Sequence, residues 1–280
     1  MSCQQRSLAL ETEIWGTATE RTTQWILVEY CGEWHPKMRI PNLQLPVSFA
    51  GALDSISKRD GWKILWIRRP GASGKYVYWW DLDSKKCKVA SIDADWNDGF
   101  ENEERWQYPE DIGLSAPQVL VCTHGQRDRC CAVLGGVIFA ELRRHLPETV
   151  WQVTHLGGHR FAPTALCLSL GLLLGRIEQS DGINIARAVM MQNSQLIRTA
   201  IIRGDVRLSK REQARQLWLA EQEGELLSTR EEQFVWLDKN GQRLQTKQYL
   251  QQLGELAVSC GDAHTKPVYQ WCFESHETVE

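Results

Sequence analysis

The sequence predicts a protein of mixed α/β (α+β) class built around a mixed β-sheet. Three observations support this class. In the second half of the chain, short β-prone apolar runs alternate with amphipathic segments of helical period. The first half shows a weaker version of the same order. The composition, with 42% hydrophobic and 24% charged residues, is that of an ordinary soluble globular chain.

The first half is expected to hold one strand, one helix and a hairpin. Segment 24–30 is apolar and β-prone, and segment 48–61 has helical spacing with a glycine at its end. Segments 63–71 and 75–82 predict two strands joined in a hairpin at PGASG. The order β–α–β–β suggests a weaker duplicate of the half that follows.

The second half carries the stronger pattern. Segment 117–122 predicts a strand, and 131–146 an amphipathic helix with cationic residues in its last turn. Segment 150–155 predicts a second strand, 164–177 a hairpin, and 182–192 a helix. The order β–α–β followed by β–β–α is that of a thioredoxin-like fold with a mixed sheet.

Three domains are predicted from these patterns. The acidic stretch that begins at residue 93 and continues to residue 117 reads as a linker between domains. The tail predicts a long helix at 209–223, a hairpin at 232–246 that turns at Asn240–Gly241, and a helix at 248–257. The expected boundaries are 1–112 for an N-terminal domain, 113–205 for a thioredoxin-like domain and 206–280 for a C-terminal extension of helix and hairpin.

Charge and cysteine content exclude several classes of protein. A net charge of −3 and a pI near 6.2 argue against an electrostatic nucleic-acid binder. No apolar run reaches the roughly 18 residues of a membrane span. The nine cysteines, an odd number without a secretory signal, argue against a disulfide framework and for a cytoplasmic protein.

The chemistry of the chain is concentrated in two loops. VCTHGQRDRCC at 121–131 places three cysteines after a predicted strand, and THLGGHRF at 154–161 places His155 and His159 after the next. On a regular strand the two histidines would lie about 13 Å apart. A turn at the intervening glycines can bring both imidazoles to one point. In a thioredoxin-like topology the two loops lie at the same end of adjacent strands, so we expect cysteine and histidine side chains to converge.

Two thiolates and two imidazoles suit zinc or an iron–sulfur cluster. Zinc sites usually hold one ligand pair only two to four residues apart. Here seven or eight residues separate the cysteines, which favours a wider binuclear cluster. Cys130 and Cys131 point about 100° apart on a starting helix. One of them is therefore expected to be a ligand, and the residue pattern alone leaves the choice open.

The pattern C-x-H-x-x-R-D-x-x-C followed by H-x-G-G-H-R-F resembles that of the sucrase/ferredoxin-like family. The segments EIWGTATERTTQWILVEYCGEW, WIRRPG and SCGDAHTKPVYQW resemble this family more loosely. The resemblance implies a thioredoxin-like ferredoxin with a 2Fe-2S cluster. It implies that the ligands are Cys122, Cys131, His155 and His159, and that Cys130 is not a ligand.

Other residues of the two loops are expected to support the site. His124 is expected to brace its loop. Arg127, Asp128 and Arg160 are expected to tune the site through hydrogen bonds and charge. The alternative for the first two is an Arg127–Asp128 salt bridge that braces the loop.

The implied function is that of a one-electron carrier that works with a redox partner protein. Protonation of histidine ligands is expected to couple electron uptake to proton uptake. The alternatives are a zinc-stabilised protein and a thiol-based redox sensor that uses Cys130 and Cys131. No pair of carboxylates points to sugar hydrolysis. Near the C-terminus, Cys260 and Cys272 either approach each other or are two separate thiols, and the second interpretation is simpler.

Overall fold

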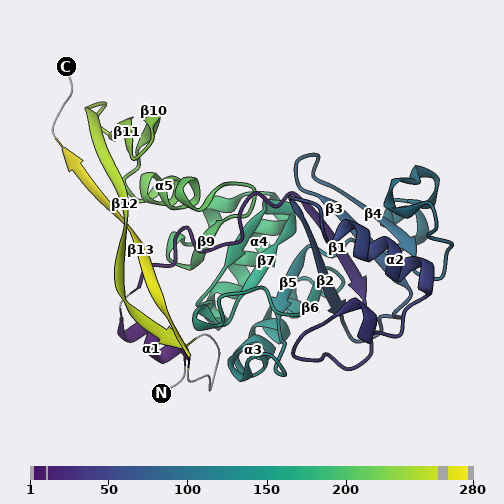
Figure 1. Ribbon diagram of the computed structural model, residues 1–280. Coiled ribbons are helices and arrows are strands. Elements are labelled where there is room, and N and C mark those ends of the chain that lie inside the picture. The colour runs from purple at the N-terminus through teal and green to yellow at the C-terminus, as the bar shows by residue number, and fades with distance from the viewer. Residues whose placement is uncertain (1–2, 11, 258–263, 277–280) are drawn as a thin grey trace.

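The structure is a computed structural model that describes residues 3–10, 12–257 and 264–276. It contains a nine-stranded mixed sheet and a four-stranded antiparallel sheet near the C-terminus (Figure 1). The helices are α1 (Cys3–Ala9), α2 (Val47–Ile56), α3 (Arg129–His145), α4 (Gly182–Met191) and α5 (Lys210–Glu221). The large sheet holds β1 (Gln24–Glu29), β2 (Trp62–Arg68), β3 (Tyr76–Asp81), β4 (Lys86–Ser91), β5 (Val119–Cys122), β6 (Val150–Val153), β7 (Ala165–Cys167), β8 (Leu172–Leu174) and β9 (Ile202–Asp205). The small sheet holds β10 (Glu225–Arg230), β11 (Gln233–Leu237), β12 (Arg243–Ala257) and β13 (Thr265–His276).

The large sheet consists of two halves with the same topology. Its strand order is β4-β3-β1-β2-β6-β5-β7-β8-β9. In the first half β1 pairs in parallel with β2 and antiparallel with β3. In the second half β5 pairs in parallel with β6 and antiparallel with β7. Each parallel pair is joined through a helix, α2 or α3. The predicted α+β class with a thioredoxin-like mixed sheet is therefore confirmed, and the weaker first half repeats the topology of the second.

The two halves join through β2 and β6, which run antiparallel. They pair only at Ile67 with Val153 and at Arg68 with Gln152, in the last residues of both strands. The carboxyl ends of β2 and β6 therefore meet at the centre of the sheet. Since β1 is parallel to β2 and β5 is parallel to β6, the loops that follow all four strands gather in this region.

The predicted hairpin of segments 63–71 and 75–82 is wrong. Strands β2 and β3 do not pair with each other, because β1 lies between them. The connection crosses the end of β1, where the Glu29 carboxylate accepts hydrogen bonds from the backbone N–H groups of Gly74 at 2.9 Å and Lys75 at 3.1 Å. The hairpin partner of β3 is β4. A buried carboxylate from a distant residue therefore shapes this turn.

The expected linker at 93–117 is also wrong over its first part. Trp96, Phe100 and Trp106 are at most 8% exposed and belong to the core around α2, where they pack near Phe49. Burial of these aromatic rings folds the acidic stretch onto the first half. The acidic side chains of the segment lie between the buried rings in sequence, which is why the composition suggested a solvated linker.

Helix α3 packs closely against the end of β5. A methyl group built on Gly135 would overlap the carbonyl oxygen of Cys122 and lie 3.1 Å from its carbonyl carbon. The absence of a side chain at Gly135 therefore lets the helix approach the strand. This approach brings the first turn of α3, with Cys131, to the end of β5.

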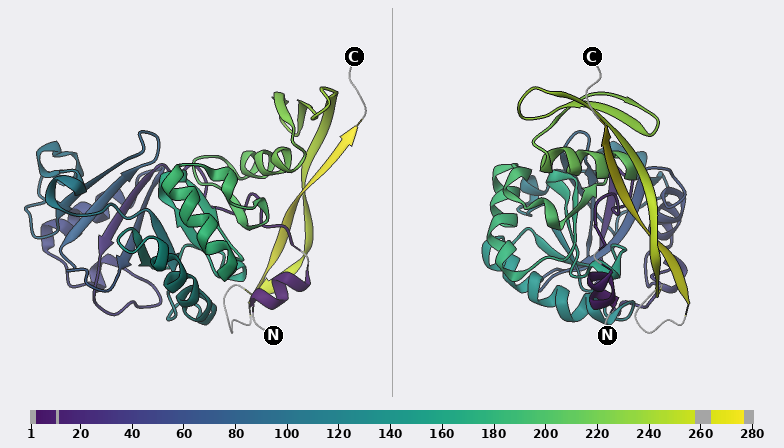
Figure 2. Two further views of the ribbon diagram at one scale, coloured as in Figure 1. Left: turned by 180° about the vertical axis from the view of Figure 1, so that it is seen from behind. Right: turned by 90° about the vertical axis from the view of Figure 1, so that its left-hand side faces the viewer.

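The C-terminal extension contains more strand than the sequence predicts. The expected helix at 209–223 is α5, which begins with a capping box between Ser209 and Glu212. The hairpin at Asn240–Gly241 is the turn between β11 and β12. Figure 2 shows that β12 and β13 form a long hairpin along one side of the body, with α1 at its lower end.

The predicted helix at 248–257 is wrong, because these residues lie in β12. Gln, Leu and Glu favour a helix, but propensity is a weak determinant against tertiary pairing. Strand β12 pairs antiparallel with β13 as far as Ala257, which is matched to Thr265. Cys272 lies on β13 and donates to Gln251 Oε1 at 3.2 Å, whereas Cys260 lies outside the described residues. In the part of the chain that is described, no helix is long and apolar enough to cross a lipid bilayer.

Candidate metal centre

Three of the four expected ligands converge in one group of two buried thiols and one partly exposed imidazole. Cys122 is the last residue of β5, Cys131 lies in the first turn of α3, and His155 follows β6 by two residues. His155 Nδ1 lies 4.0 Å from Cys122 Sγ and 3.8 Å from Cys131 Sγ. The three ligand atoms all lie within 4.8 Å of one another. Both cysteines are 1% exposed, so the group is shielded from water on the side of the thiols.

The fourth expected ligand, His159, belongs to an adjacent group. His155 Nε2 and His159 Nδ1 each lie 3.9 Å from Asp128 Oδ2. The two imidazole rings are 6.3 Å apart between centroids and nearly parallel, at 30°. Asp128 was expected near the site on its periphery, and the structure places its carboxylate between the two histidines. His155 is common to both groups and joins them into one continuous centre.

Asp128 also stands at the start of α3, where an aspartate ordinarily caps the helix. Its carboxylate makes no capping hydrogen bond to the helix. The side chain is 1% exposed and is turned toward the histidines. Arg127, by contrast, is exposed. The arrangement therefore directs the negative charge of the loop toward the imidazoles.

Of the two adjacent cysteines, Cys131 is the one in the thiol–imidazole group. Cys130 is also buried, at 8% exposed. The S–H of Cys131 hydrogen-bonds to Cys122 and lowers the pKa of the Cys122 thiol well below its usual value. The same hydrogen bond, with burial, raises the pKa of Cys131. These directions favour, in the metal-free pair, a thiolate at Cys122 and a proton on Cys131.

His124 braces the cysteine loop. Its Nε2 donates to the backbone carbonyl of His35 at 2.9 Å, and its ring packs edge-on against Trp34 with centroids 5.7 Å apart. Burial lowers the pKa of His124, so the ring is neutral near pH 7. The backbone N–H of His124 also hydrogen-bonds to Cys122 and favours its thiolate. The hydrogen bond between His124 and His35 joins the loop after β1 to the loop after β5.

Two arginines surround the histidine loop. The Arg160 guanidinium lies over the ring of Phe161 at 4.7 Å from its centroid, and burial lowers its pKa. Arg203, on β9, is 3% exposed and lies over the same ring at 5.1 Å. Burial lowers the pKa of Arg203 to about 9, so it remains a cation at neutral pH. Among the described residues, no carboxylate lies within ion-pair distance of Arg203.

Arg203 is not among the site residues expected from the sequence, although it supports the histidine loop directly. Its Nη1 donates to the carbonyl of Gly157 at 2.8 Å, and its Nε donates to Thr17 Oγ1 at 3.1 Å. Its Nη2 donates to the carbonyl of Thr17. These bonds connect three segments that are far apart in sequence. A lone arginine in IIRGD carries no local sign of such a role, because β9 itself was not expected.

Gly158→Ala is expected to destabilise the protein by about 3 kcal/mol. Gly158 has φ +72°, which disfavours any side chain, and a Cβ there would lie 2.6 Å from Arg203 Nη2. Gly157 has φ +82° with nothing within 4 Å of a built Cβ, so Gly157→Ala should lose only about 1 kcal/mol. Urea unfolding of the two variants measures the difference. Equal losses would contradict close packing of Arg203 under the loop.

The fold and this centre define a class of protein: an α+β protein with a thioredoxin-like sheet whose strand ends carry a buried thiol–imidazole group able to hold a metal. A family model described as Sucrase/ferredoxin-like matches residues 14–204. The match covers more than half of the chain, so the protein belongs to the sucrase/ferredoxin-like family. It includes both loops of the centre and leaves out α5 and the small sheet. Comparisons with curated proteins and with solved structures found no match.

Proposed function

We propose that the protein is a 2Fe-2S electron-transfer protein that carries one electron at a time. The observation that carries this proposal is the convergence of Cys122, Cys131 and His155 in a buried group, with His159 beside it. The donor set of two thiols and two imidazoles fits a cluster of this kind. When bound, the cluster would supply a centre that accepts and returns a single electron. Cys122, Cys131, His155 and His159 would hold it.

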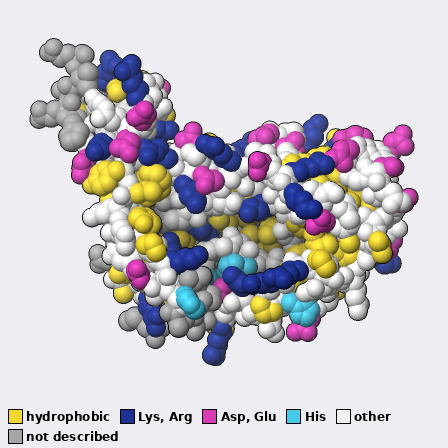
Figure 3. Space-filling view, viewed as in Figure 1, with side chains coloured by type: hydrophobic (Ala, Val, Ile, Leu, Met, Phe, Trp, Pro, Cys, Tyr) yellow, Lys and Arg dark blue, Asp and Glu magenta, His cyan; other side chains and the backbone are white. Residues whose placement is uncertain are grey.

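The chain's own residues would bury this centre and control protons around it. The Asp128 carboxylate faces His155 Nε2 and His159 Nδ1, an arrangement that orients imidazole ligands. Burial lowers the pKa of His159, and the charge of Asp128 opposes this shift without reversing it. The His155 side chain is 21% exposed and that of His159 is 11% exposed. His155 would therefore exchange protons with water more readily. Figure 3 shows histidine side chains at the lower centre of this face, with Lys and Arg side chains beside them.

A structural zinc site is the second candidate function. In a tetrahedral zinc site the S···N distance between ligands is about 3.5 Å, from the usual Zn–S and Zn–N lengths. The observed 3.8 and 4.0 Å are close to this value. The long spacing between the two cysteines favours the cluster. A thiol-based redox sensor using Cys130 and Cys131 is the third candidate, and all three suit a reducing compartment such as the cytoplasm.

The test is an absorption spectrum with iron, sulfide and zinc analysis on protein purified without oxygen. Two irons and two sulfides per chain, with visible bands, are expected. One zinc without visible bands would overturn the electron-transfer proposal in favour of a structural site. With a cluster present, the reduction potential should rise as the pH falls, by up to about 59 mV per unit for one proton per electron. A reduction potential that does not change from pH 6 to 10 would show that electron uptake is not coupled to proton uptake.

Metal binding is expected to release about one proton near neutral pH. A metal requires both cysteines as thiolates. The lowered pKa of Cys122 favours the thiolate of this residue, whereas the raised pKa of Cys131 means that its thiol must give up a proton. Zinc affinity should therefore fall about tenfold for each unit that the pH decreases. Calorimetry of zinc binding to metal-free protein, in two buffers of different ionisation enthalpy, counts the protons. Release of no proton would contradict a protonated Cys131 in the metal-free protein.

A further inference from the structure

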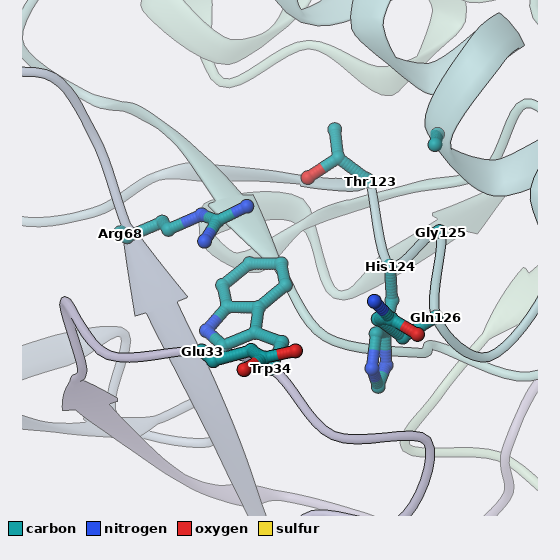
Figure 4. Close-up of a pocket in the computed structure, with 8 residues that line it drawn as sticks. Glu33, Trp34, Arg68, Thr123, His124, Gly125 and Gln126 are labelled. Atoms are coloured by element: carbon teal, nitrogen blue, oxygen red, sulfur yellow. The ribbon is translucent and has the colours of Figure 1, made fainter.

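A second site lies where the carboxyl ends of the two halves meet. It is an open cavity of about 460 Å³. Glu33 and Trp34 line it from the loop after β1, Arg68 from the end of β2, and Thr123 and Gln126 from the loop after β5 (Figure 4). A cavity of this volume takes a small organic molecule. Crevices at the carboxyl ends of strands are where open α/β sheets most often bind ligands.

Arg68 is held in one orientation within this cavity. Its guanidinium carbon lies 4.0 Å from the ring centroid of Trp34, and its Nε donates to Gln152 Oε1 at 3.3 Å. In the described part of the chain, no carboxylate lies within 4.0 Å of its terminal nitrogens, whereas the neighbouring Arg69 pairs with Glu148 at 2.6 Å. A flat, oriented guanidinium with both terminal nitrogens available is suited to bind a carboxylate through two parallel hydrogen bonds.

Thr123 provides the second, independent sign of a ligand. The residue is 8% exposed, and its hydroxyl has no hydrogen-bond partner among the described residues. Figure 4 shows this hydroxyl on the side of Thr123 that faces the Arg68 guanidinium across the cavity. A buried hydroxyl without a partner is unfavourable for folding. A group that bridges Arg68 and Thr123 would remove this penalty.

The charge of the cavity limits the ligand. Arg68 is its cation and Glu33 its anion, so the charges of the lining side chains cancel. Such a lining accepts one negative charge on Arg68 but opposes a dianion. We propose that the cavity binds a small organic monocarboxylate, with its carboxylate held by the Arg68 guanidinium and the Thr123 hydroxyl. Because Thr123 directly follows Cys122, the bound molecule would lie beside the metal centre. The proposal does not depend on which metal, if any, that centre holds.

The experiment is an NMR titration of the metal-free full chain with acetate, benzoate and inorganic phosphate. Amide shifts of Thr123 and Gly125 report on the cavity. The variants are Arg68→Met, Arg68→Lys and Thr123→Val, with Arg69→Met as the matched control. Arg69→Met removes an arginine at the adjacent position that is already paired with Glu148. Unfolding temperatures are measured for all variants.

Saturable shifts with both carboxylates are expected for the wild type and for Arg69→Met. Arg68→Met should weaken binding at least tenfold, and Arg68→Lys should weaken it less because it keeps the charge but loses the planar fork. Thr123→Val should weaken binding yet raise the unfolding temperature, since it removes an unpaired buried hydroxyl. The two effects expected for Thr123→Val, on binding and on the unfolding temperature, test the proposal even if the Arg68→Met variant does not fold.

Three results would overturn the proposal. The first is the absence of saturable shifts in the wild type. The second is equal weakening by Arg68→Met and Arg69→Met. The third is tighter binding of phosphate than of either carboxylate, which would reject the monocarboxylate assignment.

Discussion

Cys122→Ser and Cys131→Ser are each expected to lower the metal content of the purified protein at least tenfold, whereas Cys130→Ser should leave it unchanged. Even changes to groups that only contact a ligand reduce metal affinity about 10- to 100-fold, so loss of a ligand should do more. Cys122 and Cys131 lie in the same buried group as His155, and Cys130 is not in that group. His155→Ala is expected to behave like the two cysteine variants. Iron, sulfide and zinc analysis measures the effect.

Cys130→Ser is the matched control, because it makes the same chemical change at the adjacent position, which is also buried. His159→Ala separates the two arrangements of the centre. Loss of metal or a changed absorption spectrum in the His159→Ala variant would identify His159 as a fourth ligand. A full metal load with an unchanged spectrum would restrict the ligands to the three convergent residues. Loss of metal in Cys130→Ser with retention in Cys131→Ser would contradict the geometry described above.

Gly135→Ala is expected to destabilise the protein by about 3 kcal/mol or more and to reduce its metal content. A Cβ at Gly135 would overlap the backbone of Cys122, which cannot move aside as the end of a flexible side chain could. Separation of α3 from β5 would then move Cys131 away from Cys122. Denaturant unfolding and metal analysis measure the two effects.

Gly136→Ala is the control for this change. A Cβ at Gly136 meets nothing within 4 Å, and the residue lies inside the same helix. Alanine is the better helix former, so Gly136→Ala should stabilise the protein by about 0.5–1 kcal/mol. A loss of stability shared by both variants would show that close packing of α3 on β5 is not what requires Gly135.

The errors of sequence-based prediction have a common cause. The helix predicted at 248–257 and the hairpin predicted between residues 63 and 82 both rest on local pattern. In each case pairing with another strand decided the outcome: β13 pairs with β12, and β1 lies between β2 and β3. The elements at 117–122, 131–146 and 150–155 agree with the prediction. Each has a clear pattern of apolar residues, and each packs against elements that are close to it in the sequence.

The sequence by itself determined the class of fold, the order of the elements between residues 117 and 192, and the two loops that carry the cysteines and histidines. These features follow from the spacing of apolar residues and from the positions of glycines and cysteines, which are visible within short stretches of the sequence. Only the tertiary structure decided that Cys131 faces Cys122, that Asp128 turns to the imidazoles, and that Arg203 supports the histidine loop. It alone also placed Arg68 opposite Thr123. These contacts join residues on different strands and helices, so they depend on how the two halves pack and on no local pattern.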